Sequence, residues 1–348
     1  MERWRRFVYL LVDRFTHGDY PLRRIDASSL FLSPFEQVRR PPRRRATKLP
    51  EPDLSFAARE GEGNMEFFAL FGRGKNKSLI VSVDQKGFAI MYDLDGRVVH
   101  YMANPHKPRK FSTVSLAVGD GLYVMDRCLH SDSRGGFEAL TFDKSERTGL
   151  PYWRWHCLEL PPYVHEPRYR PTDIGACTVV GGSSIWISVL GVGTYGFDTV
   201  RASWSPAPVA SWELPFNGRA DYFPEYDQWL GFSSQTNKLC SWDMSAAAGS
   251  SEPVLCNVFE DVEVPHDWTL ESSHLVRLGP GMFCVAKFFE RVFNTENSEG
   301  FIYRPAESFV VLTGLMLKPR DGGGKGLEAM MHKCRVYKFE CVTTGCIY

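Results

Sequence analysis

The sequence has no long hydrophobic run. A transmembrane helix needs about 18 to 20 consecutive apolar residues, and none of the 348 residues of the chain form such a stretch. The apolar run from Phe7 to Val12 is short, ends at Asp13 and Arg14, and is followed by no small-residue cleavage site. We therefore expect a β-strand here rather than a signal peptide, and no insertion into a membrane.

The sequence also lacks the residue spacings that hold metals and disulfides. Its nine cysteines are scattered and odd in number, with no C-x-x-C pair, and its nine histidines form no H-E-x-x-H or H-x-H pattern. These absences exclude a disulfide framework and a sequence-encoded zinc motif, so we expect no metal-binding and no cofactor-binding residues. Scattered cysteines favour a reducing compartment, the cytoplasm and/or the nucleus.

Net charge is absent as well, because 41 basic residues balance 41 acidic ones. Without a global positive field, binding to nucleic acid is not expected. The strongest local charge is the interrupted basic run Arg39, Arg40, Arg43, Arg44 and Arg45. It lies in a segment, 33–64, that we expect to be a long irregular linker loop, first basic and then acidic. The run is either an interaction or nuclear-import site or a solvated loop, and the acidic residues that follow offset its field.

Long helical periodicity is nearly absent, and only 27–31 and 327–333 resemble short helices. Short runs rich in Val, Ile, Tyr, Phe and Trp are abundant instead, each bounded by Gly, Asp, Asn or Pro. Examples are 78–83, 88–92, 115–118, 121–125 and 138–142. This pattern of strands and turns predicts an all-β protein.

A weak repeat runs through the chain, with units at 67–102, 111–161, 173–215, 218–260 and 273–340. The second to fourth units end a strand on an aromatic residue followed by Asp: Phe142-Asp143, Phe197-Asp198 and Trp242-Asp243. W-R-W-H-C-L-E-L-P follows in the second unit and W-E-L-P in the third. We expect the Asp to start the turn after the third strand of a blade, and the Trp to pack the outer strand against the next blade.

These observations predict a kelch-like β-propeller of five or six four-stranded blades, organised as a single domain over 1–348. A repeat of about 45 residues suits four strands per blade. We expect N- and C-terminal strands to close the propeller, with 7–13 joining the sheet that contains 334–340, because closure removes exposed edges from the first and last blades.

The stretch L-G-V-G-T-Y-G-F-D, at 190–198, contains the spacing G-x-G-x-x-G of a dinucleotide-binding loop. Such a loop must follow a strand and open a helix whose N-terminal amides hold the pyrophosphate. A strand precedes it here, but T-Y-G-F-D is aromatic and ends in Asp, which is typical of another strand. We interpret the glycines as a hairpin turn between the second and third strands of a blade.

Several stretches together resemble a large plant family, greatly expanded in grasses, that is classed as a domain of unknown function and is similar to kelch-type propellers. They are Y-P-L-R-R-I-D-A-S-S-L-F (20–31), K-L-P-E-P-D-L-S-F (48–56), V-S-V-D-Q-K-G-F-A-I-M-Y-D (81–93) and E-L-P-F-N-G-R-A-D-Y-F-P-E-Y-D-Q-W-L-G-F (213–232). The resemblance implies a propeller-like fold and carries over no catalytic residues. In the last stretch, Arg219 is expected either to lock blade to blade, through hydrogen bonds to backbone carbonyls of the next blade, or to bind a ligand.

The sequence contains no catalytic constellation, such as a G-x-S-x-G elbow. We therefore expect a non-catalytic intracellular propeller that binds protein partners, in a regulatory or adaptor role, because propellers present loops from many blades. The alternative is an enzyme or small-ligand binder that uses the central propeller channel. Convergent charged side chains on the channel strands would favour the alternative.

Overall fold

The structure is a computed structural model that describes residues 4–12, 18–32, 46–58, 64–71, 78–108, 112–145, 147–246, 251–297, 300–320, 322, 324–339 and 345–348. These residues form 25 strands and two one-turn 3-10 helices, η1 (Ala27–Leu30) and η2 (Pro162–His165). Neither helix of this described part is long and apolar enough to cross a membrane. The all-β class expected from the sequence is confirmed.

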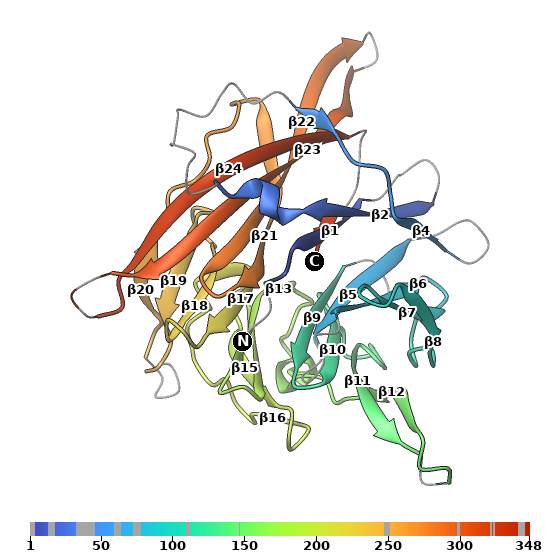
Figure 1. Cartoon of the computed structure of the whole chain (residues 1–348). Coiled ribbons are helices and arrows are strands. Elements are labelled where there is room, and N and C mark those ends of the chain that lie inside the picture. Colours follow the sequence, from blue (N-terminus) through green and yellow to red (C-terminus); the bar gives the residue numbers. More distant parts are fainter. Residues whose placement is uncertain are drawn as a thin grey trace. The chain divides into compact units, whose positions relative to one another are not determined.

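Contacts among the described residues gather in two compact units (Figure 1). The terminal unit comprises Met1–Ala57 and Phe259–Tyr348, and the middle unit comprises Ala58–Val258. The single domain over 1–348 stays a prediction, and the two units are described separately below.

The middle unit consists of four antiparallel meanders, each of four strands in chain order. We number them 2 to 5, because meander 1 belongs to the terminal unit. Meander 2 contains β5 (Met65–Phe71), β6 (Ser78–Asp84), β7 (Ala89–Asp93) and β8 (Val98–Tyr101), and meander 3 contains β9 (Thr113–Val118), β10 (Gly121–Asp126), β11 (Phe137–Lys144) and β12 (Pro151–Cys157). Meander 4 contains β13 (Ile174–Val180), β14 (Ser184–Val189), β15 (Gly193–Asp198) and β16 (Ser203–Trp204), and meander 5 contains β17 (Phe216–Phe223), β18 (Gln228–Ser233), β19 (Leu239–Asp243) and β20 (Val254–Val258).

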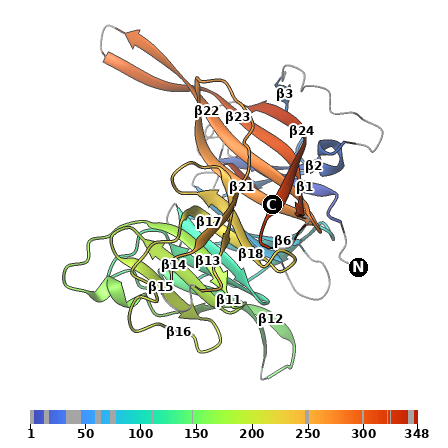
Figure 2. The ribbon, with the colours of Figure 1, turned by 90° about the vertical axis from the view of Figure 1, so that its left-hand side faces the viewer.

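The terminal unit contains two further meanders, and Figure 2 shows their long strands in blue, orange and red. Meander 1 has the spatial order β25 (Gly345–Ile347), β1 (Phe7–Val12), β2 (Asp19–Asp26) and β4 (Leu54–Ala57). Meander 6 has β21 (Trp268–Gly279), β22 (Met282–Asn297), β23 (Gly300–Pro319) and β24 (Leu327–Phe339), with β3 (Thr47–Lys48) added in parallel to β24. Within the described residues the chain thus has six four-stranded units, in agreement with the five or six blades expected.

First strands of successive meanders lie next to each other, as in neighbouring propeller blades. β5 contacts β9 and β9 contacts β13, while β13 pairs in parallel with β17 through Ala176 and Gly218. In the terminal unit, β21 contacts β25. Between the sheets lie apolar clusters, such as the one that joins Trp186 of meander 4 to Phe216 and Trp242 of meander 5. Each meander therefore buries its faces against its neighbours within the same unit.

Aspartate side chains start the turn after the third strand in four meanders. In each, a carboxylate oxygen accepts a hydrogen bond from the backbone N–H two residues later: Asp26 from Ser28, Asp93 from Asp95, Asp198 from Val200, and Asp243 from Ser245. This Asx-turn geometry confirms the role expected for Asp198 and Asp243. Asp143 differs, because its carboxylate accepts from the Thr141 hydroxyl and contacts the ring of His156.

Tryptophan side chains in meanders 3, 4 and 5 hydrogen bond to the preceding meander, whereas the sequence predicted that the Trp of the second repeat unit, Trp155, packs against the next one. Their indole N–H groups donate to backbone carbonyls earlier in the chain: Trp155 to Ala103, Trp204 to Glu159, and Trp229 to Val179. The donors belong to meanders 3, 4 and 5, and the acceptors lie in or directly after meanders 2, 3 and 4. For Trp155 the direction is reversed because its ring is buried in one apolar cluster with Phe68 and Leu70 of meander 2. The Trp of W-E-L-P in the third unit, Trp212, packs as expected against the cluster that contains Phe216 and Trp242 of meander 5.

Chain closure takes place, but through a different strand from the one expected. β1 pairs with β25, with Leu10 opposite Ile347. The expected partner, 334–340, is not in this sheet: its residues 334–339 belong to β24 of meander 6, and residue 340 lies outside the described residues. The alternating apolar pattern of 334–340 fits either sheet, so only the tertiary structure selects the strand. Two other expectations also change: 327–333 is strand rather than helix, and 33–64 contains the strands β3 and β4.

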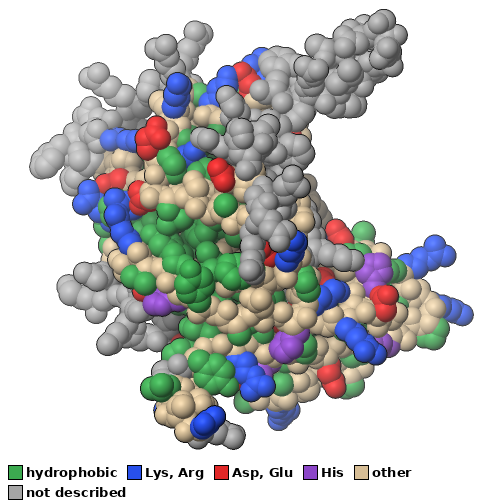
Figure 3. All heavy atoms as spheres, turned by 90° about the vertical axis from the view of Figure 1, so that its right-hand side faces the viewer, with side chains coloured by type: hydrophobic (Ala, Val, Ile, Leu, Met, Phe, Trp, Pro, Cys, Tyr) green, Lys and Arg blue, Asp and Glu red, His purple; other side chains and the backbone are tan. Residues whose placement is uncertain are grey.

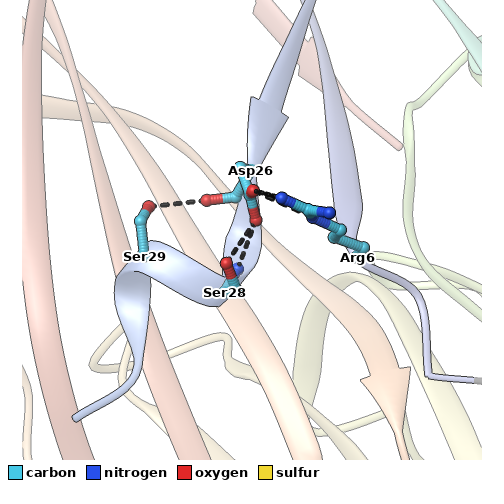
Figure 4. A network of polar contacts seen from close by, with 4 residues as sticks. All are labelled: Arg6, Asp26, Ser28 and Ser29. Atoms are coloured by element: carbon cyan, nitrogen blue, oxygen red, sulfur yellow. Dashed lines mark hydrogen bonds and ion pairs between the residues drawn. The ribbon is translucent and has the colours of Figure 1, made fainter. Parts of the chain in front are cut away.

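A polar network holds the start of η1 against β1 (Figure 4). Asp26 accepts from the Arg6 guanidinium at 2.9 and 2.7 Å and from the backbone N–H of Ser28 at 3.0 Å, and the Ser29 hydroxyl donates to the Asp26 carbonyl. Burial alone would raise the pKa of Asp26, but the hydrogen bonds from Arg6, those from Ser28 and the Arg6 charge together outweigh it and lower that pKa. The ionised carboxylate is therefore the form that the folded chain prefers.

We expect Asp26→Asn to lower the melting temperature at neutral pH and to do so progressively less in acid. A lowered folded pKa means that the stabilisation is complete above the unfolded value of about 3.9 and is lost as the pH falls through the folded value. Asparagine can still cap Ser28 through its side-chain oxygen but cannot accept from Arg6, so the variant removes the contact with Arg6 and keeps the cap. Melting curves of both proteins between neutral pH and about pH 3 test this, and a difference that does not change with pH would contradict it.

Candidate functional site

The basic run singled out from the sequence, Arg39, Arg40, Arg43, Arg44 and Arg45, lies outside the described residues. Its role as an interaction or nuclear-import site stays a prediction. The same holds for most of the linker loop 33–64 around it, of which only the β3 and β4 regions are described.

The glycines at 191–196 form the hairpin expected between the second and third strands of a blade. β14 and β15 pair from Ser184 opposite Asp198 to Val189 opposite Gly193, and no helix follows. Gly191 and Gly193 have positive φ values of 73° and 108°. The pyrophosphate site of a dinucleotide fold needs amides at a helix N-terminus, which this strand hairpin does not provide.

Arg219 lies on β17, the first strand of meander 5, and makes an ion pair with Asp221 two residues later, at 2.6 Å. The backbone carbonyls of another blade, which the sequence suggested as its partners, are not the acceptors observed. Opposite Arg219 in the parallel β13–β17 pairing lies Cys177, which is buried. Burial raises the pKa of the Cys177 thiol to about 12, so the thiol is protonated at neutral pH. This pair of first strands therefore supplies a charged pair and an unreactive thiol.

Strand β8 is the most exposed strand of the middle unit that carries apolar side chains. Val98 and Val99 are each 48% exposed, Tyr101 is 83% exposed, and His100 between them is exposed too. Successive side chains of a strand point to opposite faces, so both faces of β8 are open to solvent. Among the described residues β8 pairs only with β7, which leaves its second edge without a strand neighbour.

The outermost strand of meander 5, β20, has the same character. It pairs only with β19 in the described part of the chain, and Val254, Leu255 and Val258 are exposed. Figure 1 labels β8 as the strand next to β7 in meander 2, and Figure 3 shows one face of the molecule, on which hydrophobic side chains lie at the surface among charged and polar ones. Apolar outer edges are thus a property of at least two meanders.

A cluster of chemically different side chains lies between meander 2 and meander 3. His106, Glu138 and Cys157 each place one potential metal-ligand atom within 4.8 Å of the other two. The Glu138 side chain is completely buried, and its Oε1 accepts from the backbone N–H of His106 at 2.8 Å and lies 3.0 Å from the ring Nδ1 of His106. The sequence did not predict this cluster, because its members are 32 and 19 residues apart and match no ligand spacing.

The segment that carries His106 is held on both sides. The Trp155 indole donates to the carbonyl of Ala103 at 3.0 Å, and the side-chain oxygen of Asn104 accepts from the backbone of Ala89 at 3.2 Å. Pro105 is buried. Contacts to meander 2 and meander 3 therefore fix the backbone next to His106 on the side of Glu138.

Comparison with known proteins gives similarities of fold. A crystal structure of a protein from Lactobacillus plantarum is 12% identical, with a TM-score of 0.44 over 97% of this chain and 100% of the other. The β-propeller domain of Cps50 (Swd1) from Myceliophteria thermophila is also 12% identical, with a TM-score of 0.42 over 95% of this chain and 85% of the other. An auxiliary nutrient binding protein from Bacteroides ovatus is 9% identical, with a TM-score of 0.38 over 93% of this chain and 78% of the other.

No curated protein sequence matches the chain. The family comparison, in contrast, covers nearly all of it, from the strand β1 to the strand β24. With residues 5–337 matched, the chain belongs to the family described as a protein of unknown function, DUF1668.

Proposed function

We propose that this protein is a non-catalytic scaffold of the cytoplasm and/or nucleus that binds another protein, and that strand β8 is the docking edge. The proposal rests on one observation: β8 exposes Val98, Val99 and Tyr101 beside a backbone edge that has no strand neighbour among the described residues. Single exposed apolar residues are normal on a protein surface. A run of them along an open edge strand is a template for pairing with another chain.

Recognition would occur by strand addition. An extended segment of the partner would pair its backbone with the free N–H and C=O groups of β8, and its side chains would meet the apolar residues of one face. Val99 and Tyr101 lie on one face of the strand and Val98 and His100 on the other, so both faces can contribute. Burial of such side chains contributes a free energy of about 25 cal/mol per Å² of apolar surface, so a partner that covers them binds more tightly.

We further propose that the fold is of the kelch type and that the chain comes from the plant family, expanded in grasses, that its sequence resembles. Aromatic-Asp pairs at the ends of third strands support the kelch likeness: Tyr92-Asp93, Phe197-Asp198 and Trp242-Asp243. The indole groups that join consecutive meanders support it as well. We propose a regulatory or adaptor role for the protein, because these are roles that partner binding alone can serve.

The test is the double variant Val99→Lys/Tyr101→Lys, which places two charges on one face of β8. Both side chains are exposed, so the melting temperature should change little. Affinity purification with quantitative mass spectrometry from cells that express the protein would name candidate partners. Each candidate, once purified, would be titrated against the wild type and the variant, and we expect at least about tenfold weaker binding by the variant, equivalent to about 1.4 kcal/mol.

The matched control is Leu190→Lys/Val200→Lys, because these two residues are also apolar and exposed but lie in turns of the same unit. Binding by this control should equal that of the wild type. Equal binding by the β8 variant and the wild type would refute the docking edge. Sedimentation that shows a dimer abolished by the β8 substitutions would also refute the proposal, since the occupant would then be a second copy of the chain.

A further inference from the structure

We propose that His106, Glu138 and Cys157 form a binding site for a divalent transition metal ion of the zinc class. The three side chains offer a ring nitrogen, a carboxylate oxygen and a sulfur, which are the three kinds of atom that bind Zn²⁺ in proteins. Such a site is independent of the docking edge on β8 and of any reaction.

Zinc geometry fits the cluster after small movements. Bonds of about 2.0 to 2.1 Å to nitrogen or oxygen and about 2.3 Å to sulfur place the ligand atoms of a tetrahedral site about 3.3 to 3.6 Å apart. The Nδ1 of His106 is 3.0 Å from Oε1 of Glu138, and all three ligand atoms lie within 4.8 Å of one another. An ion between them thus requires ligand atoms to shift by about 1 Å, which side-chain rotation supplies.

The β-sheet places two of the ligands together. Glu138 on β11 and Cys157 on β12 are directly opposite each other in the antiparallel ladder. Opposite residues project on the same face, with Cβ atoms about 4.5 to 5.5 Å apart. The third ligand, His106, comes from the segment between meander 2 and meander 3, whose backbone is hydrogen bonded to Glu138 itself. The ligand set is therefore largely formed before an ion arrives.

The charge of the three ligands and the solvent access of the cluster are suited to a divalent metal ion. Glu138 has no solvent-exposed surface, and a buried carboxylate needs compensation by hydrogen bonds or by a cation. With the Cys157 thiol deprotonated and His106 neutral, the ligands carry two negative charges, which match a divalent ion. His106 and Cys157 are exposed, so solvent reaches the site and water can complete the coordination. The thiolate and imidazole favour zinc-class ions over Mg²⁺ or Ca²⁺.

Calorimetric titration of the full chain with zinc sulfate, in a reducing buffer without chelators, is the first test. We expect one Zn²⁺ ion per chain, a rise in melting temperature with Zn²⁺, and no comparable response to Mg²⁺. Cys157→Ser and His106→Ala should each weaken Zn²⁺ binding at least about tenfold, the lower limit of losses seen for residues that merely support a metal ligand. Cys157 is exposed, so its variant should keep the wild-type circular dichroism spectrum.

Two variants control for general effects of losing a cysteine or a histidine. Cys256→Ser removes another thiol of the middle unit, and His156→Ala removes the histidine that contacts Asp143 rather than Glu138. Both should bind Zn²⁺ like the wild type. Cobalt(II) gives a second readout, because a thiolate ligand produces a charge-transfer absorption that nitrogen and oxygen ligands do not, and Cys157→Ser should abolish it whereas Cys256→Ser should not.

Three outcomes would overturn the site. They are an absence of saturable Zn²⁺ binding by the wild type, unchanged affinity in Cys157→Ser, and a cobalt complex without the thiolate absorption. In the first case, the contact between His106 and Glu138 is a clamp between meanders and nothing more. These results do not bear on the β8 proposal, which is tested with different variants.

Discussion

Replacing Trp242 with Ala is expected to lower the free energy of unfolding of the middle unit by about 3 to 5 kcal/mol. The side chain is only 2% exposed and packs in the cluster that joins meander 4 to meander 5, with its ring 5.5 Å from that of Phe216. Alanine would leave a cavity that the surrounding strands, paired on both sides of β19, can close only in part. For a unit of this size, the loss corresponds to a melting temperature lower by roughly 6 to 20 °C.

Differential scanning calorimetry of the purified variants measures the effect. Trp242→Phe should lose less, because a ring still fills most of the site. The control is Tyr101→Ala, which deletes a large aromatic side chain that is 83% exposed and should leave the melting temperature within about 2 °C, in line with surface substitutions. A melting temperature of Trp242→Ala equal to that of the wild type would place this tryptophan on the surface of the folded chain.

Gly193→Ala is expected to be the second most damaging change, with a loss of about 1 to 3 kcal/mol. Gly193 has a φ of 108°, which L-residues rarely adopt, and a Cβ there would lie 3.0 Å from the carbonyl oxygen of Ala210. That carbonyl accepts a hydrogen bond from the backbone N–H of Thr194 on β15, so it cannot move freely. Strain in the backbone and a close contact with a fixed oxygen therefore act together.

Two glycines separate these causes. Gly191→Ala also strains a positive φ but meets no atom within 4 Å, so it should lose less than Gly193→Ala. Gly175→Ala has ordinary φ and ample space, and it should be close to neutral. Thermal melts of the three variants rank them.

Addition of NAD or NADP should shift none of the melting temperatures, because a ligand stabilises only a state that binds it. Saturable cofactor binding in calorimetry would contradict the hairpin interpretation.

Local patterns are sufficient for the strands and turns. The runs at 78–83, 115–118 and 121–125 become β6, β9 and β10 almost to the residue, because alternation of apolar side chains and turn-forming Gly and Asp act over a few neighbours. Asp198 and Asp243 start turns for the same local reason, a side chain that accepts from the backbone two residues later.

Contacts between distant parts of the chain were predicted less well. Meander 1 has no repeat unit of its own in the sequence, because β25 comes from the C-terminus and its other three strands from the N-terminus. The sequence also predicted the wrong neighbour for Trp155, because a tryptophan in a strand indicates a buried side chain but does not indicate which sheet covers it. The segment 327–333 looks helical in isolation and becomes part of β24 because β23 pairs with it.

The sequence by itself determined the all-β class, the four-stranded repeat and the hairpin at 191–196, because each depends on residues close together in the chain. Only the tertiary structure decided that β25 rather than β24 closes onto β1, that no described strand pairs with the outer edge of β8, and that His106 meets Glu138 and Cys157. The physical reason is that pairing partners, burial and ligand clusters depend on which strands become neighbours. Many strands of similar composition could satisfy those roles, and packing selects among them.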